Sequence, residues 1–174
     1  MTTVDHLSVA QDHLSVAQDR LSVAPDAVPE HEVQLVVRPL WEPALAISGA
    51  DLRSVYVERY WLGVVGPSVI MLLRRLARGL EEHPQGFQIS LADTARAIGL
   101  GAGTAKQSPI NRTIDRACMF GAARRVSETE IHVRTHLPRL TARQLSRLPL
   151  AVRSTHQQWV LAESGADPTR PTAA

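Results

Sequence analysis

One helix with clear start and stop signals constrains the fold more than any other segment: residues 108–121, SPINRTIDRACMFG. Ser108 followed by Pro109 is a typical helix start. The serine oxygen can accept an N–H of the first turn, and proline at the first helical position leaves no N–H unpaired. Apolar residues then recur on one helix face, at Ile110, Ile114, Ala117 and Cys118. Because Gly121 can end the helix, the segment predicts an amphipathic helix over 108–120 that packs on a core.

The opposite face of this predicted helix is polar and carries Asn111, Arg112, Asp115 and Arg116. A single helix fits the major groove of DNA, where asparagine pairs with adenine and arginine with guanine. The same residues also suit a solvated surface on which Asp115 pairs with neighbouring arginines, so both interpretations stay open. Candidates for phosphate contacts flank the helix, at Lys106, Gln107, Arg124, Arg125 and Arg134.

The positive charge of the chain is concentrated in the same region. Residues 106–153 hold 10 basic and 3 acidic side chains, net +7, whereas residues 1–50 are net −5 and the whole chain is +2. Of the 19 basic residues 18 are arginine, which together with abundant alanine indicates a GC-rich, bacterial genome. Since codon bias supplies arginine without functional need, position matters more than number, and it favours a nucleic-acid partner for this block.

Regular elements are predicted on both sides of the helix. An apolar stripe at helical spacing runs through Val69, Leu72, Leu73, Leu76 and Leu80. Residues 87–89 predict a short strand, and Ser90 and Gly99 delimit a small helix. Beyond the central helix, Ala123–Ser127 and Glu130–Thr135 predict a hairpin.

Two C-terminal helices follow the hairpin. A capping box at Thr141 and Gln144 begins the first, and Pro149 can begin the second. One face of the final helix carries Val152, His156, Trp159 and Val160. This face either closes the core or forms a dimer seam around Trp159.

The region before residue 68 is predicted in less detail. Residues 33–50 are expected to be an extended arm, with a short strand that ends at Pro39. A helix is expected from Asp51, broken by Gly63 and by Gly66 with Pro67. Tyr56, Tyr60 and Trp61 are interpreted as core aromatics rather than as a stacking platform for nucleobases.

The N-terminus contains a heptad repeat, DHLSVAQ, DHLSVAQ and DRLSVAP. Leucine and alanine fall at the a and d positions of a coiled coil. Three heptads with alanine at d bury little surface, so the favoured interpretation of residues 1–32 is a disordered tail. Residues 164–174 are expected to be a second tail.

Three quoted stretches resemble a winged helix-turn-helix domain of bacterial transcriptional regulators. They are ISLADTARAIGL for the first helix of the motif, SPINRTIDRACMFGAARR for the recognition helix and its exit, and RRVSETEIHVRTHLP for the wing. More broadly, residues 51–163 are similar to winged-helix proteins of high-GC bacteria. The linker GLGAGTAKQ departs from the pattern, because it is longer and richer in glycine than a tight turn.

The resemblance implies an α+β fold, mostly helical, with a winged helix-turn-helix domain, a small hairpin wing and additional C-terminal helices. It also implies sequence-specific binding of double-stranded DNA through a recognition helix at 108–120 and a wing at 123–135. We therefore expect a transcriptional regulator that needs no cofactor or metal, with a homodimer through the C-terminal helix as an open alternative to a monomer. The alternative function is a winged-helix adaptor that binds another protein in a replication or partition complex and has little DNA affinity.

Enzyme motifs are not found in the sequence. The glycines of residues 99–107 lack the Gly-Lys-Ser/Thr of a phosphate loop. His132 and His136 are interpreted as surface residues of the wing rather than metal ligands, and Cys118 as a small core side chain rather than a redox sensor. With no signal peptide or membrane span recognised, a cytoplasmic protein is expected.

Overall fold

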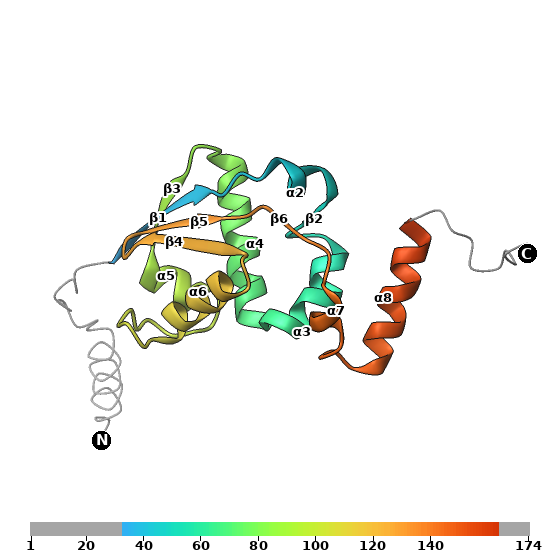
Figure 1. Cartoon of the computed structure of the whole chain (residues 1–174). Coiled ribbons are helices and arrows are strands. Elements are labelled where there is room, and N and C mark those ends of the chain that lie inside the picture. The colour runs from blue at the N-terminus through green and yellow to red at the C-terminus, as the bar shows by residue number, and fades with distance from the viewer. Residues whose placement is uncertain (1–32, 164–174) are drawn as a thin grey trace, which may run out of the picture. The chain divides into compact units, whose positions relative to one another are not determined.

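The computed structural model describes residues 33–163, which form a mixed α+β unit (Figure 1). The expected heptad tail at 1–32 and the tail at 164–174 lie outside the described residues. In chain order the elements are β1 (Gln34–Pro39), α2 (Pro43–Ser48), β2 (Ala50–Asp51), the π-helical turn η1 (Val57–Trp61), α3 (Leu62–Val65), α4 (Pro67–Glu82), β3 (Phe87–Ser90), α5 (Leu91–Ala97), α6 (Pro109–Met119), β4 (Ala123–Ser127), β5 (Glu130–Val133), β6 (His136–Leu137), α7 (Ala142–Leu145) and α8 (Leu150–Glu163).

The main sheet has four strands in the order β3, β1, β5, β4 (Figure 1). β1 is antiparallel to β3 and parallel to β5, and β5 is antiparallel to β4. The predicted hairpin is confirmed as β4 and β5. Its second strand is shorter than expected, because the chain leaves the main sheet at Arg134 and then pairs in β6.

The expectation of a separate extended arm at residues 33–50 needs correction. The strand that ends at Pro39 is present, but it lies inside the main sheet between β3 and β5. Leu35 and Val37 point into the core and are 1% and 0% exposed. Leu35 and Val37 alternate with the less buried Gln34, Val36 and Arg38, and this spacing predicts a strand with one buried face. Because it lies between two other strands, β1 is an integral part of the domain.

The helix expected from Asp51 is also different in the structure. Asp51 belongs to β2, which pairs with β6, and its carboxylate accepts the N–H of Arg53 at 2.7 Å. The helix starts after Ser54, whose hydroxyl accepts the N–H of Val57 at 3.3 Å. It then continues through Gly63 and ends at Gly66, where φ is +88°. The predicted break at Gly63 is wrong, whereas the break at Gly66 is confirmed.

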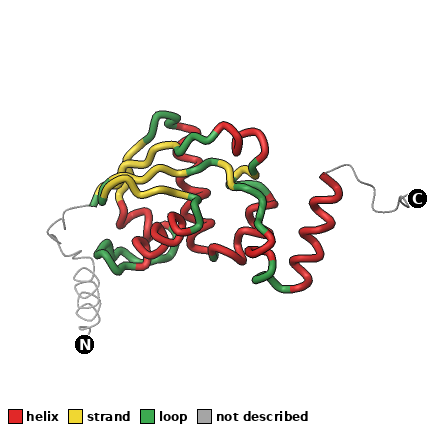
Figure 2. The backbone as a smooth tube through the Cα atoms, in the orientation of Figure 1, coloured by secondary structure: helices red, strands yellow, loops and turns green. Residues whose placement is uncertain are grey.

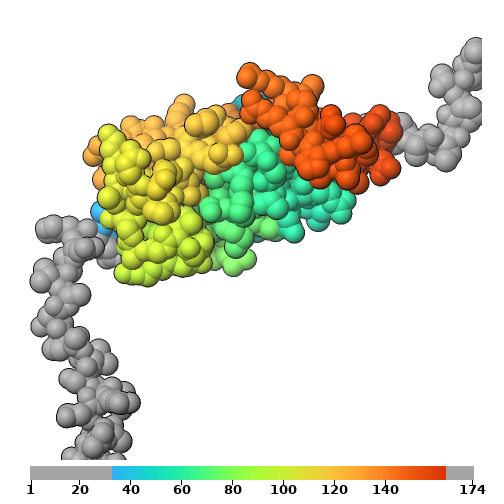
Figure 3. Space-filling view, turned by 90° about the horizontal axis from the view of Figure 1, so that it is seen from below, coloured from blue at the N-terminus to red at the C-terminus, as the bar shows by residue number. Residues whose placement is uncertain are grey.

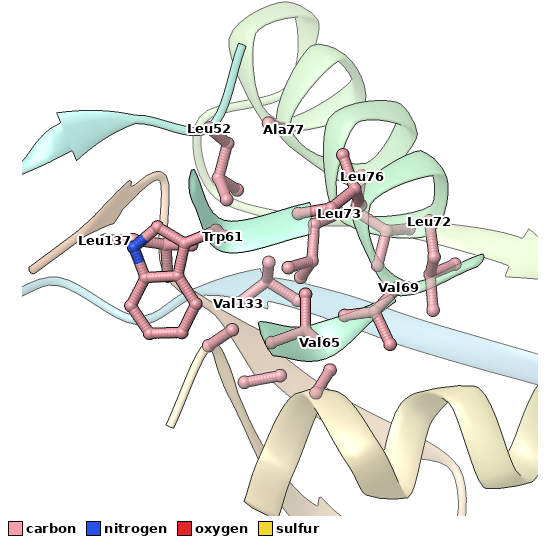
Figure 4. Packing of buried hydrophobic residues seen from close by; sticks show 14 of the residues in the cluster. Leu52, Trp61, Val65, Val69, Leu72, Leu73, Leu76, Ala77, Val133 and Leu137 are labelled. Atoms are coloured by element: carbon pink, nitrogen blue, oxygen red, sulfur yellow. The ribbon is translucent and has the colours of Figure 1, made fainter. Parts of the chain in front are cut away.

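The main core lies between α4 and the sheet. The predicted stripe of α4 is buried throughout, at Val69, Leu72, Leu73, Leu76 and Leu80. Figure 4 shows Val65, Val69 and Leu73 gathered near Val133 of β5, with Trp61 beside Leu137. The apolar spacing read from the sequence therefore selects the face that covers β1 and β5.

A second cluster of aromatic side chains attaches α8 to the domain. Tyr56, Tyr60 and Trp61 are at most 1% exposed, which confirms them as core residues. The Trp159 ring of α8 lies edge-on to Tyr56 and Tyr60, at centroid distances of 6.2 and 6.1 Å. Within this chain, Trp159 therefore helps to close the core.

The central order of α4, β3, α5, α6 and the hairpin is the order that the sequence predicts. Ser90 caps α5, since its hydroxyl accepts the N–H of Asp93 at 3.2 Å. Thr141 and Gln144 form the predicted capping box of α7. Between α5 and α6 the chain runs as a loop, drawn in green in Figure 2.

Candidate nucleic-acid interface

Helix α6 begins and ends as its sequence predicts. The Ser108 hydroxyl accepts the N–H of Asn111 at 3.4 Å, and Pro109 occupies the first turn. At the other end Gly121 adopts a φ of +71°. The N–H groups of Gly121 and Ala122 then bond the carbonyls of Cys118 and Ala117, a Schellman ending that a residue with a side chain would strain.

The orientation of α6 follows from its buried residues, Ile110, Thr113, Ile114 and Ala117. Arg112, Asp115 and Met119 lie three or four residues apart on the opposite side and are exposed, Met119 by 78%. Figure 3 views the protein from below, with the yellow residues that include α6 next to the teal residues of η1 and α3. The outward stripe of α6 is therefore available to a partner.

Asn111, expected to read a base, holds the preceding loop instead. Its Nδ2 donates to the carbonyl oxygens of Thr104 at 2.9 Å and Ala105 at 3.0 Å. Its Oδ1 accepts from the Arg125 guanidinium at 3.4 Å. Because both ends of the amide are engaged within the chain, Asn111 positions the loop against α6.

Arg125 joins the hairpin to α6. The same Nη2 that approaches Asn111 lies 3.3 Å from a carboxylate oxygen of Asp115, one helical turn further on. This ion pair agrees with the second interpretation of the sequence, in which Asp115 pairs with an arginine. The partner, however, comes from β4 rather than from α6. Arg125 is thus engaged with the helix and is not free for a phosphate.

Arg116 is also engaged inside the domain. Its Nε donates to the carbonyl oxygen of Val65 at 2.7 Å, and its Nη2 to that of Val64 at 2.9 Å. The guanidinium lies 5.3 Å from the centroid of the Phe120 ring. A positive charge at the C-terminal end of a helix is stabilised by the helix dipole. Arg116 therefore links α6 to the C-terminal end of α3.

Arg134 holds the exit of the hairpin. Its Nη1 donates to the carbonyl oxygen of Gly121 at 2.8 Å, and its Nη2 pairs with Glu42. Its buried Nε has no hydrogen-bond partner among the described residues. The side chain connects β5, the end of α6 and the segment before α2.

The remaining predicted contacts are exposed and have no side-chain partner within residues 33–163: Lys106, Gln107, Arg112 and Arg124. Lys106, Asn111, Asp115 and Arg125 line a pocket of about 380 Å³ between the loop, α6 and the hairpin turn. Arg112 and Arg116 line a shallower depression of about 280 Å³ beside Gly66 and Pro67 at the start of α4. The structure thus separates the predicted residues into those with a hydrogen-bond partner inside the domain and those without one. Asp115 and Arg116, which belong to the first group, are also exposed.

The side chains weighed as ligands or nucleophiles have ordinary environments. His132 Nε2 lies 3.0 Å from Glu130 Oε1, while His136 belongs to the other sheet. Glu130 also pairs with Arg38, and the hydrogen bond from His132 holds the pKa of Glu130 below its usual value. Burial raises the pKa of the half-buried Cys118 thiol, which disfavours the reactive thiolate. Across residues 33–163, three or more His, Cys, Asp or Glu side chains nowhere converge as a metal site requires.

Sequence reasoning overlooked two features of this surface. Met119 was not considered as a contact residue, although its position seven residues after Arg112 places both on one face. The partners of Arg116 were not predictable from local spacing, because Val64 and Val65 precede it by more than fifty residues.

Comparisons with protein-family models, with curated proteins and with solved structures found no match. Of the helices between residues 33 and 163, none has both the length and the apolar character needed to cross a bilayer.

Proposed function

We propose that the protein binds double-stranded DNA as a winged-helix transcriptional regulator, with α6 as recognition helix and β4–β5 as wing. The observation that carries the proposal is the outward stripe of α6 together with the exposed cations beside it. Asn111 ties the loop with Lys106 to α6, and Arg125 ties the hairpin with Arg124 to it. The loop and α6 thus form one connected surface. Arg124, next to Arg125 on the edge strand β4, points to the opposite face of the sheet.

Arg112 has the position and chemistry for a base contact. It lies in the N-terminal half of α6, which in helix-turn-helix proteins reaches the base edges. Its guanidinium can pair with guanine in two places at once. Lys106 on the loop suits a phosphate contact, which fixes orientation without reading sequence. Arg124 suits a phosphate at the outer edge of the sheet, because β4 is an edge strand.

The order of the elements supports the same function. From α4 to β5 the elements are a helix, a strand, two helices and a hairpin. This is the order expected of a winged helix. The loop between α5 and α6 is longer than a tight turn, but the two hydrogen bonds from Asn111 fix it. A cytoplasmic regulator that acts without cofactor or metal is part of the proposal.

A selection from random duplexes, followed by titration of the recovered site, tests the proposal. Arg112→Ala should cost about 1–3 kcal/mol on that site. Arg124→Ala should weaken all duplexes alike and reduce the slope of log affinity against log salt by about one. The matched control Arg147→Ala, an exposed arginine next to α7, should leave binding unchanged. Binding that is indifferent to Arg112→Ala contradicts the assignment of α6.

The second candidate is an adaptor that binds another protein, and two exposed apolar side chains at and before α2 favour it. Trp41 is 73% and Ile47 of α2 is 89% exposed, and α2 buries none of its residues. A protein partner would remove these side chains from water. Salt separates the candidates, because DNA binding through arginines weakens steeply with salt and an apolar contact does not.

A homodimer through α8 remains a prediction of the same proposal. The Trp159 ring faces Tyr56 and Tyr60 of its own chain, so a seam around Trp159 would use the residues beside it. Val160, the residue after Trp159, is 39% exposed and can take part in such a contact. Light scattering of wild type and of Val160→Glu tests it.

A further inference from the structure

A groove of about 640 Å³ runs between α4, β3 and α5, away from the pockets that α6 lines. Its floor is apolar and includes Phe87 and Ile89 of β3 and Ile98 after α5. Met71 of α4, 54% exposed, lies at the same groove. A partly exposed apolar floor of this size suits a segment with apolar side chains of its own.

β3, on one side of the groove, is an edge strand of the main sheet. The N–H of Leu91 bonds the carbonyl of Val33, which continues the antiparallel register of β3 with β1. In an antiparallel pair, residues whose N–H and C=O point toward the neighbouring strand alternate with residues whose N–H and C=O point away from it. The N–H and C=O of Gln88 therefore point away from β1, toward the open edge, and can pair with one more strand.

The rim of the groove is positive. Four arginines and one glutamate line it. Arg53 pairs with Asp51 and Glu81, and Arg74 with Glu58. Arg75 and Arg78 are exposed and have no side-chain partner within residues 33–163. Glu82, at the end of α4, is exposed and likewise has no side-chain partner within residues 33–163. The unpaired charge beside the apolar floor is therefore two arginines against one glutamate, which leaves a net positive charge.

We propose that this groove binds an extended acidic peptide segment of a partner protein, which adds to the main sheet as a strand along β3. The backbone of the segment pairs with Gln88, and the side chains that face α4 alternate with those that face away. On the α4 side, an apolar side chain packs on Phe87 and Ile89. A carboxylate two residues along the segment reaches Arg75 or Arg78.

Two other occupants fit the groove less well. A second copy of this chain paired through β3 would bring Arg75 and Arg78 close to the same arginines of the other copy, and like charges repel. DNA would leave the apolar floor without a matching surface, and it cannot continue a strand. The inference does not depend on DNA binding by α6.

A library of random twelve-residue peptides, displayed on phage and selected on the full-length protein, tests the proposal. The recovered peptides should carry an apolar residue and Asp or Glu two positions apart. Synthesised, they should bind Arg75→Glu/Arg78→Glu at least ten-fold more weakly than wild type. Arg143→Glu/Arg147→Glu, the same charge change within and just after α7, should bind like wild type. In hydrogen exchange, the amide of Gln88 should become protected when peptide is present.

Met71→Glu is the second variant. Because Met71 is exposed, this change should leave the fold intact, so that a loss of binding cannot be attributed to unfolding. It should also weaken peptide binding at least ten-fold, with an unchanged melting temperature. No enrichment, peptides without acidic residues, or unchanged exchange at Gln88 would overturn the proposal. So would a duplex of 30 base pairs that loses affinity for Arg75→Glu/Arg78→Glu, since those arginines would then belong to a DNA surface.

Discussion

Arg116 donates a hydrogen bond from Nε to the carbonyl oxygen of Val65 at 2.7 Å, across 51 residues of sequence. A second bond reaches Val64, so one guanidinium satisfies two carbonyls at the end of α3. Arg112, one turn earlier on α6, has no such bond. Two arginines that look equivalent in the sequence therefore have different roles, one structural and one available to a partner.

The first prediction separates these roles. Arg116→Ala should lower the free energy of unfolding by about 1–3 kcal/mol, because it removes hydrogen bonds from a charged donor and leaves two carbonyls unpaired. Arg112→Ala, a matched exposed position on the same helix, should change stability by less than about 0.5 kcal/mol. Urea denaturation of both variants measures the difference. Equal effects would mean that the contact with Val65 does not persist in solution.

The second prediction concerns the start of α6. Ser108→Ala removes the oxygen that accepts the N–H of Asn111 and should cost about 1 kcal/mol. The control is Ser154→Ala in α8, an exposed helix position where alanine is the better helix former. Thermal melts should show a loss for Ser108→Ala and none for Ser154→Ala. An unchanged melt for Ser108→Ala would place the helix start elsewhere.

The elements that the sequence predicted well are those with local signals. The stripe of α4, the capping residues of α5, α6 and α7, and the glycine that ends α6 all act within a few residues. A capping residue or terminal glycine pairs backbone groups that the end of a helix leaves unpaired. An apolar stripe marks the face of the helix that is buried. For that reason the order from α4 to the hairpin could be derived without the structure.

The elements that were missed depend on distant partners. β1 pairs in parallel with β5, so that Val36 lies opposite Glu130. Nothing in the alternation of residues 33–37 distinguishes an arm from a central strand. The same limit applies to the site, because Asn111 and Arg116 have side chains suited to bases but find carbonyl partners that only the fold brings near.

The third prediction concerns Gly79, on the face of α4 that meets β3. A methyl group at this position would overlap the ring of Phe87. Overpacking costs about 1–3 kcal/mol, while alanine gains about 1 kcal/mol over glycine in a helix. Gly79→Ala should therefore destabilise the wild type by about 1 kcal/mol. In a Phe87→Ala background the clash is gone, and the same change should stabilise. Urea denaturation of the four chains measures this change of sign, and an effect of one sign in both backgrounds would contradict the packing.

The fourth prediction concerns His156, the buried residue of α8. Its Nε2 lies 2.9 Å from the hydroxyl of Tyr56, which also accepts the N–H of Leu140. The Tyr60 ring packs against the imidazole at a centroid distance of 4.8 Å. Burial, and secondarily the positive charge of Arg139, lower the pKa of His156 below its ordinary value. The contact with Tyr56 therefore holds a neutral imidazole between α8 and the helix of residues 55–65.

The pH dependence follows from that direction. The unfolded chain protonates His156 near its ordinary pKa of about 6.5, whereas the folded chain protonates it only at lower pH. The stability that this histidine contributes is complete above about pH 6.5 and is lost as the pH falls from there toward the folded pKa. The melting temperature should therefore fall more between pH 7.5 and pH 5.5 for wild type than for His156→Gln. The glutamine amide can still accept a hydrogen bond from Tyr56. His83→Gln, at an exposed position, is the matched control and should keep the wild-type difference. If the melting temperature falls by the same amount for His156→Gln and wild type between the two pH values, the imidazole is not held neutral at this contact.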